Sequence, residues 1–340
     1  MTFLAPGRRV IACSNNARLV AYRAMTYRFL FIIDPIERIL PEKDTTFVFM
    51  LESQKRQHAV YQCGVGDLFV DRCQPRTRCR RTEVVRDTPH YRIFEERTEA
   101  LTWFDAIFMR KDPPVDLTYL FATHILSLVD PASTLVLNEP RALRDANEKL
   151  YALHFPEIIP PSLVTADITR LKSFLDELGG EMIIKPLDGC GGAGVFHVHR
   201  NDRNLNAILE MSTVNGARLI MAQRYLPEIR GGDKRLIVLD GEPLGAVLRV
   251  PREDEHRGNI HAGGTCLKAP ITARDHVIIN TLAPHLRRDG LAFVGLDIIG
   301  DWLTEVNVTS PTGIQEINGL DGACLEAPVI DFVERRLNGR

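Results

Sequence analysis

Three side chains with carboxylate or amide oxygens lie close together in the segment FVGLDIIGDWLTEVNVTSPTG, residues 293–313. This segment has the pattern of two strands joined near Gly300-Asp301. Side chains alternate between the two faces of a strand. The apolar residues of the two strands therefore share a face only if even positions pair with even ones, which requires a bulge or a connection of odd length. That register also places Asp297, Glu305 and Asn307 together on the opposite face.

Carboxylate and amide oxygens suit Mg²⁺, which is usually held by one or two carboxylates together with substrate phosphates. The alternative is the polar outer face of an ordinary hairpin. Asn307 lies between two valines, where an amide is a poor choice for a strand. The pattern therefore favours a metal site.

A second candidate is EMIIKPLDGCGGAGVFHV, residues 181–198, in which an apolar run delivers Lys185 to a turn containing Gly189, Gly191, Gly192 and Gly194. Glycines let backbone N–H groups approach an anion closely, and the lysine adds a positive charge. The spacing matches neither a Walker A loop nor a dinucleotide-binding fingerprint. A phosphate-binding turn and a purely structural hairpin both remain compatible with it.

Charged residues flank two further apolar segments. Asp233, Lys234 and Arg235 open a probable hairpin that turns at Asp240-Gly241, and Arg249 lies near its end. Basic groups beside a metal-phosphate site could stabilise a transferring phosphoryl group, although a lone arginine is more often a surface residue.

The elements that must position these residues indicate an α/β protein. Apolar segments 27–33 and 59–63 flank an amphipathic segment 45–57, a strand–helix–strand unit that predicts a parallel sheet. Strand 105–110 runs into Arg110, Lys111 and Asp112, and ligands of such sheets bind at the carboxyl ends of strands. A solvated charged loop is equally compatible there. We further expect strands at 134–138, 181–186 and 194–199, and helices at 144–155, 169–179 and 204–213.

Net charge, hydrophobicity and cysteine content limit the classes of function that the chain can have. The formal net charge is −2, which gives no electrostatic case for nucleic acid or an acidic membrane, and no apolar run approaches the roughly 18 residues of a membrane helix. Seven scattered cysteines indicate a reduced cytosolic protein rather than a disulfide framework. Residues 1–24 are predicted to be a dispensable arm, with an import signal as the alternative, and the arginine-rich segment 72–81 to be a solvated loop.

Several motifs in order resemble those of bacterial glutathione synthetases, which are ATP-grasp ligases: MRKDPPVD, LRDANEKL, IIKPLDGCGGAGVF, MAQRYLP, GDKRLIVLDGEP, RGNIHAGG, FVGLDIIG and LTEVNVTSPTGIQEI. The resemblance runs from about residue 27 to 316. It implies an ATP-grasp fold of α/β (α+β) class with a Rossmann-like, parallel-sheet N-terminal domain. The implied parts are residues 25–146, a small subdomain 147–222, and a C-terminal domain 223–340 carrying a flexible loop 252–265.

The resemblance also implies roles for individual residues. The implied ATP contacts are Lys149, Lys185, Gly189, Gly191, Gly192, Gly194, Gln223, Tyr225, Leu226 and Asp233. The implied metal ligands are Asp297, Glu305 and Asn307, for Mg²⁺ with Mn²⁺ as a possible substitute, and the implied catalytic residues are Arg235 and Arg257. The implied substrate contacts are Arg110, Lys111, Asp112, Arg249, Asn259, Ser310 and Thr312.

The implied reaction joins γ-glutamylcysteine to glycine with ATP, through an acyl phosphate, in a cytoplasmic homotetramer. The loop 252–265 would exclude water from the acyl phosphate. Cys190 departs from the pattern in the glycine turn, and an exposed thiol there would make activity sensitive to oxidants. The alternatives are an ATP-grasp ligase with a different acceptor and a nucleotide-binding scaffold without turnover.

Overall fold

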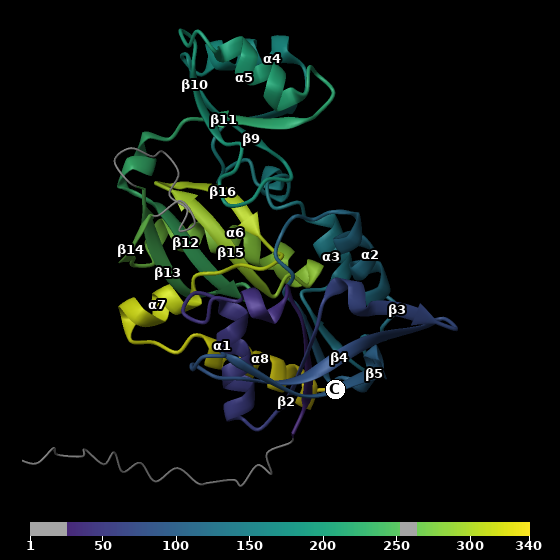
Figure 1. The fold of residues 1–340 in the computed structure, drawn as a ribbon. Helices are drawn as coiled ribbons and strands as arrows, with labels where there is room; N and C mark the ends of the chain where they lie inside the picture. The colour runs from purple at the N-terminus through teal and green to yellow at the C-terminus, as the bar shows by residue number, and fades with distance from the viewer. Residues whose placement is uncertain (1–25, 252–263) are drawn as a thin grey trace, which may run out of the picture.

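The computed structural model describes residues 26–251 and 264–340. The arm 1–24 and the loop residues Arg257 and Asn259 lie outside this part. The described chain forms three sheets (Figure 1), with strand orders β3-β4-β2-β1-β6-β7, β10-β9-β11-β8 and β14-β13-β12-β15-β16, and β5 paired to β4 of the first.

The first sheet contains the predicted parallel unit. β1 (Arg28–Ile32) pairs in parallel with β2 (Ala59–Cys63) and with β6 (Ala106–Met109), and β6 pairs in parallel with β7 (Leu135–Leu137). The crossover helix α1 (Thr45–Lys55) begins at Asp44, whose side chain accepts a hydrogen bond from the Phe47 N–H. That cap satisfies one of the unpaired N–H groups of the first turn. α2 (Leu117–Leu126) connects β6 to β7.

The solvated loop predicted for residues 72–81 is wrong, because most of this segment belongs to β4 (Gln74–Val84). β4 pairs antiparallel with β3 (Leu68–Asp71) and β5 (Tyr91–Ala100). Thr77 and Cys79 are buried while Arg78 is exposed. The arginines therefore occupy the outward positions of an alternating strand, a period-2 signal that their charge obscured.

The continuous helix predicted for residues 144–155 is also wrong. α3 (Pro140–Asp145) ends before Asn147, whose side-chain oxygen accepts hydrogen bonds from the N–H groups of Lys149 and Leu150 at 3.1 and 3.0 Å. Asparagine side chains compete with helical hydrogen bonds in this way. A short 3-10 turn (Tyr151–His154) follows, so Glu148 and Lys149 lie on an irregular segment.

The second sheet has a core of its own. β8 (Ser162–Thr165), β9 (Glu181–Pro186), β10 (Phe196–His199) and β11 (Ile220–Arg224) are all antiparallel neighbours. α4 (Ile168–Glu177) and α5 (Leu205–Thr213) cover one face, where Leu171 and Leu175 pack with Met182, Ile184 and Val198. Figure 1 shows this unit at one end of the molecule, with its other face turned toward the rest of the chain.

The third sheet is built from the two predicted hairpins, β12 (Asp233–Leu239) with β13 (Glu242–Val250) and β15 (Phe293–Ile299) with β16 (Trp302–Asn307). β14 (Thr265–Lys268) adds an edge, and α6 (Ala273–Asp289) precedes β15. The pairing of β15 with β16 shifts between Asp297 and Ile298. The predicted pairing of even with even positions is thereby confirmed, and of the two alternatives the structure has the bulge.

The chain closes with α7 (Ile314–Asp321) and α8 (Glu326–Asn338). α8 returns to the first sheet beside α1, as Figure 1 shows, and Val329 and Phe332 share one buried cluster with Phe29 and Phe47. No described helix is long and apolar enough to cross a membrane.

Candidate active site

A cavity of about 790 Å³ collects residues from all three sheets. Its lining includes every described residue predicted as a site residue except Gly194 and Lys111: Arg110, Asp112, Lys149, Lys185, Gly189, Gly191, Gly192, Gln223, Tyr225, Leu226, Asp233, Arg235, Arg249, Asp297, Glu305, Asn307, Ser310 and Thr312. Residues separated by about two hundred positions in sequence therefore line the same cavity.

Asp297 is the centre of a buried charge network on the third sheet. The Arg235 guanidinium donates to both of its oxygens, from Nε at 2.6 Å and from Nη2 at 3.1 Å. Arg249 Nη2 lies 3.1 Å from Asp297 Oδ1 and also pairs with Asp233. Burial alone would raise the pKa of Asp297, but the two guanidinium groups hold it below its usual range. Asp297 therefore carries a negative charge.

Asp233 shares Arg249 and has a different electrostatic environment. Burial raises its pKa to about 6, although the paired Arg249 acts in the opposite direction. Within the described residues, Asp233 Oδ1 and Arg249 Nε are buried with no hydrogen-bond partner. Buried polar atoms are rarely unpaired, so both atoms are available to a ligand in the cavity.

The predicted metal ligands share a face as the register demanded. Asp297 lies directly opposite Glu305 across the strand pair, and Asn307 lies opposite Gly295. Two carboxylates and an amide form an all-oxygen donor set of the kind that hard divalent cations prefer. The carboxylates are balanced here by cationic side chains, Arg235 and Arg249 on Asp297 and Lys149 on Glu305. The residues present therefore fit a divalent cation.

Two buried lysines face the same space. Lys149 Nζ lies 2.8 Å from Glu305 Oε1 and donates to the Gly189 carbonyl at 2.7 Å. Lys185 Nζ donates to Gln223 Oε1 at 3.2 Å and to the Thr304 carbonyl at 3.1 Å. Among the described residues no carboxylate forms an ion pair with Lys185, and burial lowers its pKa to about 8. A bound anion would relieve that cost.

The glycine turn between β9 and β10 has the backbone conformation that its composition suggested. Gly191, Gly192 and Gly194 have φ angles of 61°, 78° and 72°. A Cβ at Gly191 would meet nothing within 4 Å, so that position is glycine for its backbone conformation rather than for lack of space. Gly194 has the same conformation but does not line the cavity.

The first sheet supplies Arg110 at the carboxyl end of β6. Its guanidinium is buried, donates from Nε to Thr46 Oγ1 at 3.0 Å and from Nη2 to the Pro311 carbonyl at 3.0 Å, and lies over the ring of Phe293. Lys111 instead pairs with Asp34 at 3.1 Å, and Asp34 lines the cavity in its place. This end of the cavity therefore contains both positively and negatively charged side chains.

Sequence reasoning missed several cavity residues. Glu148 Oε1 accepts from the Val308 and Thr309 N–H groups and from Thr309 Oγ1, at 3.0, 3.2 and 2.8 Å. Burial and then the charge of Glu305 raise its pKa. Glu148 belongs to the NEKL motif, but the helix predicted for residues 144–155 gave no indication that its side chain faces the cavity. Other missed lining residues include Asp34, Arg38, Lys43, Asp44, Thr46 and Glu316.

Known proteins resemble this chain along nearly its whole length. The family model of the prokaryotic glutathione synthetase N-terminal domain matches residues 27–144, and the model of the ATP-grasp domain of prokaryotic glutathione synthetase matches residues 148–322. The chain belongs to the prokaryotic glutathione synthetase family.

Curated relatives named glutathione synthetase agree with that assignment. The one from Gloeobacter violaceus is 48% identical over 312 residues, covering 90% of this chain and 96% of the relative. The one from Vibrio parahaemolyticus is 42% identical over 310 residues, covering 91% and 98%. The resemblance that the sequence motifs indicated is confirmed.

Solved structures confirm the fold. D-cycloserine synthetase DcsG superimposes with a TM-score of 0.63 at 17% identity, covering 91% of this chain and 99% of that one. The ATP-grasp ligase PsnB superimposes with a TM-score of 0.62 at 19% identity, covering 92% and 99%. As a member of the prokaryotic glutathione synthetase family, the chain is an ATP-dependent ligase with the ATP-grasp fold, and ATP and a divalent metal take part in its reaction.

Proposed function

We propose that this enzyme joins the cysteinyl carboxylate of γ-glutamylcysteine to the amine of glycine, with Mg²⁺ as its divalent ion and Mn²⁺ able to replace it. The observation that carries the proposal is the cavity itself. It combines an ionised carboxylate flanked by two arginines with two buried lysines beside a glycine turn. This is the charge pattern that positioning and neutralising a triphosphate requires.

The nucleotide would lie between the second and third sheets. Lys149, Lys185 and the glycine turn would contact phosphates, since Lys185 is charged at neutral pH but lacks an anionic partner among the described residues. Gln223, Tyr225 and Leu226, at the end of β11, would contact adenine. The unpaired Asp233 Oδ1 is a suitable acceptor for a ribose hydroxyl.

Asp297, Glu305 and Asn307 would hold the metal. When bound, it would neutralise the charge of the phosphates during transfer. Lys149 contacts Glu305 in the structure, so metal binding to that carboxylate would free the Lys149 ammonium for a phosphate oxygen. Arg235 and Arg249 would then remain as the fixed cations beside Asp297.

The chemistry would take two steps without a covalent enzyme intermediate. The substrate carboxylate attacks the γ-phosphorus and forms an acyl phosphate, with ADP leaving. The glycine amine then attacks the acyl carbon, loses a proton and expels phosphate. Arg235 would stabilise the negative charge on the acyl phosphate and on the tetrahedral intermediate, a contribution typically worth on the order of 3 kcal/mol.

Substrate contacts would come from Arg110, Asp112, Ser310 and Thr312, with Lys111 acting through Asp34 rather than directly. Arg249 would contribute through its unpaired Nε. Arg257 and Asn259, which lie outside the described residues, would act from the loop over the acyl phosphate. We further propose a cytoplasmic homotetramer.

The test is phosphate release from ATP, Mg²⁺ and γ-glutamylcysteine, measured with and without glycine, with mass spectrometry of the peptide product. We expect release that depends on glycine and is stoichiometric with glutathione. Turnover with another amine but not glycine would overturn the acceptor assignment alone. Nucleotide binding without turnover would overturn the catalytic roles.

A further inference from the structure

The second sheet carries a side-chain cluster, Glu181, His197 and His199, that does not line the cavity. Glu181 begins β9, and His197 and His199 lie two residues apart on β10, so both histidines face the same side. Antiparallel pairing places His199 directly opposite Glu181. The three side chains lie on the face opposite to the buried Met182 and Val198, which pack against the helices α4 and α5.

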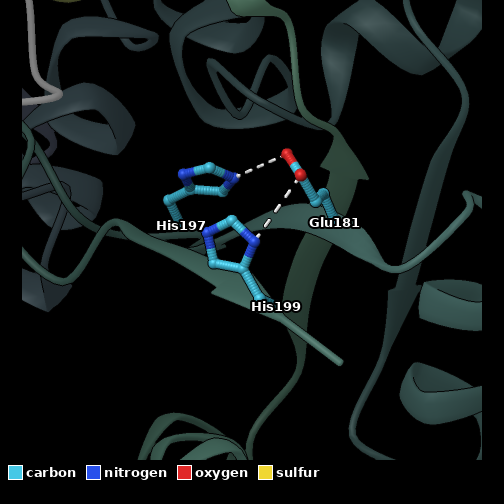
Figure 2. A group of neighbouring side chains, drawn as sticks. All are labelled: Glu181, His197 and His199. Atoms are coloured by element: carbon cyan, nitrogen blue, oxygen red, sulfur yellow. Dashed lines mark ion pairs between the residues drawn. The ribbon is translucent and has the colours of Figure 1, made fainter. Parts of the chain in front are cut away.

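The three side chains already converge. His197 Nε2 lies 3.4 Å from one carboxylate oxygen of Glu181, and His199 Nδ1 lies 3.7 Å from the other. Dashed lines mark these two ion pairs in Figure 2. One ligand atom from each residue falls within 4.8 Å of the other two. Ligands about 2.0–2.2 Å from one ion would be separated by somewhat less than this, so small side-chain rotations suffice to bring them together.

From this geometry we infer that Glu181, His197 and His199 bind a divalent transition-metal ion of the Zn²⁺ class. Two imidazoles and one carboxylate suit such ions, whereas Mg²⁺ strongly prefers oxygen. The side chains of Glu181 and His199 are 51% and 49% exposed, which leaves water access to a fourth coordination position. This site is separate in residues and in chemistry from Asp297, Glu305 and Asn307.

The surroundings hold the ligands in place. The His197 ring stacks on Tyr225, with ring centroids 3.8 Å apart and an angle of 16° between the planes, and lies 4.2 Å from the His199 ring. The pairing of β9 with β10 also fixes the backbones of Glu181 and His199 relative to each other. These restraints favour metal binding, because they reduce the side-chain freedom that binding would remove.

The experiment is a titration of the metal-free full-length protein with Co²⁺, a spectroscopic substitute for Zn²⁺, in the presence of excess Mg²⁺. We expect a visible absorption band that saturates at one Co²⁺ per chain and disappears when Zn²⁺ is added. His199→Ala and Glu181→Gln should each weaken Co²⁺ binding by at least about tenfold. The assay uses neither ATP nor turnover, so its result is independent of the proposed function.

Two controls isolate the cluster. His276→Ala, at an exposed position on α6, should leave the titration unchanged, and so should the double variant His256→Ala/His261→Ala outside the described residues. Equal Co²⁺ affinity in wild type and His199→Ala would overturn the inference. So would displacement of Co²⁺ by Mg²⁺, or the absence of saturable binding, which would reduce the cluster to a histidine–carboxylate ion pair.

Discussion

Asp297 shows how one residue can organise a site through shared partners. Its two oxygens receive Arg235 and Arg249, and Arg249 also holds Asp233. Removing one member would leave a buried charge without its partner, which is why such networks respond strongly to single changes. The geometry of the guanidinium groups matters as well as their charge, because Arg235 contacts both carboxylate oxygens at once.

Replacing Arg235 by lysine tests that geometry. Arg235→Lys retains the positive charge but loses the two-point contact, so we expect kcat for glycine-dependent phosphate release to fall about 100-fold. Arg274→Lys is the matched control, because Arg274 does not line the cavity and its guanidinium donates to the Asp301 carbonyl and lies over the Trp302 ring. A variant Arg235→Lys with more than half of wild-type activity would contradict the proposed role.

Lys185 gives a prediction for stability against pH. Its pKa is about 8 in the folded protein against 10.5 for an ordinary lysine. Between these values the unfolded chain binds more protons, so this residue makes stability rise with pH over that window. Below about pH 8 the full destabilisation by its buried charge is present.

We therefore expect the free energy of unfolding of wild type, relative to Lys185→Met, to increase by up to about 3 kcal/mol as pH rises from 8 to 10.5. Urea denaturation without nucleotide measures it. Lys172→Met, at an exposed position, should track the wild type at every pH. Parallel curves for wild type and Lys185→Met would show that Lys185 keeps an ordinary pKa.

At the scale of elements, the β12–β13 turn depends on one glycine. Asp240 and Gly241 have φ angles of 51° and 76°, the left-handed pair that a two-residue hairpin requires. A Cβ on Gly241 would lie 2.9 Å from the Ala283 Cβ of α6. The turn thus sets both the hairpin and its contact with the helix.

Gly241→Ala should lower the free energy of unfolding by about 1–2 kcal/mol, measured by urea denaturation, because it adds backbone strain and a close contact. Gly66→Ala provides the comparison, since a Cβ there meets nothing within 4 Å and its φ lies outside the left-handed region. Its effect should stay within about 0.5 kcal/mol. Equal losses in the two variants would refute the argument.

The elements also show what sequence can predict. The pairing of even with even positions in β15 and β16 followed from hydrophobic alternation, because one face is buried and a register slip would expose it; alternation left open whether a bulge or a connection of odd length would provide it. The helix predicted across Asn147 failed because side-chain hydrogen bonds overrode local propensity. β4 was not predicted because its many arginines made the segment look like a solvated loop, although buried and outward-facing residues alternate along it. The positions of Glu148 and Asp34 depend on contacts between distant segments, which periodicity does not encode.

At the scale of the molecule, the first and third sheets share buried clusters, whereas the second sheet has its own. Ion pairs reinforce the contact that closes the chain. Arg56 contacts Glu52 on α1 at 2.8 Å and Asp331 and Glu334 on α8 at 2.6 and 2.9 Å. One side chain therefore ties the two helices together.

Arg56→Ala should reduce the free energy of unfolding by about 2–3 kcal/mol, since it leaves the buried Glu52 without its main partner. The neighbouring Lys55→Ala is the control. Lys55 also contacts Glu52, at 3.2 Å, but its side chain is 73% exposed, and exposed pairs contribute about 0–1 kcal/mol. Thermal or chemical unfolding distinguishes them, and equal effects would count against the α1–α8 link.

The return of α8 to the first sheet has a consequence for biosynthesis. Arg56 bonds to the carbonyl of Ala327, a residue 271 positions later in the chain. A ribosome would therefore extrude β1, α1 and β2 long before the helix that completes their core is made. During that interval the aromatic residues Phe29 and Phe47 lack the packing of Val329 and Phe332. The nascent chain therefore exposes apolar side chains to chaperones and to other nascent chains on the same messenger RNA.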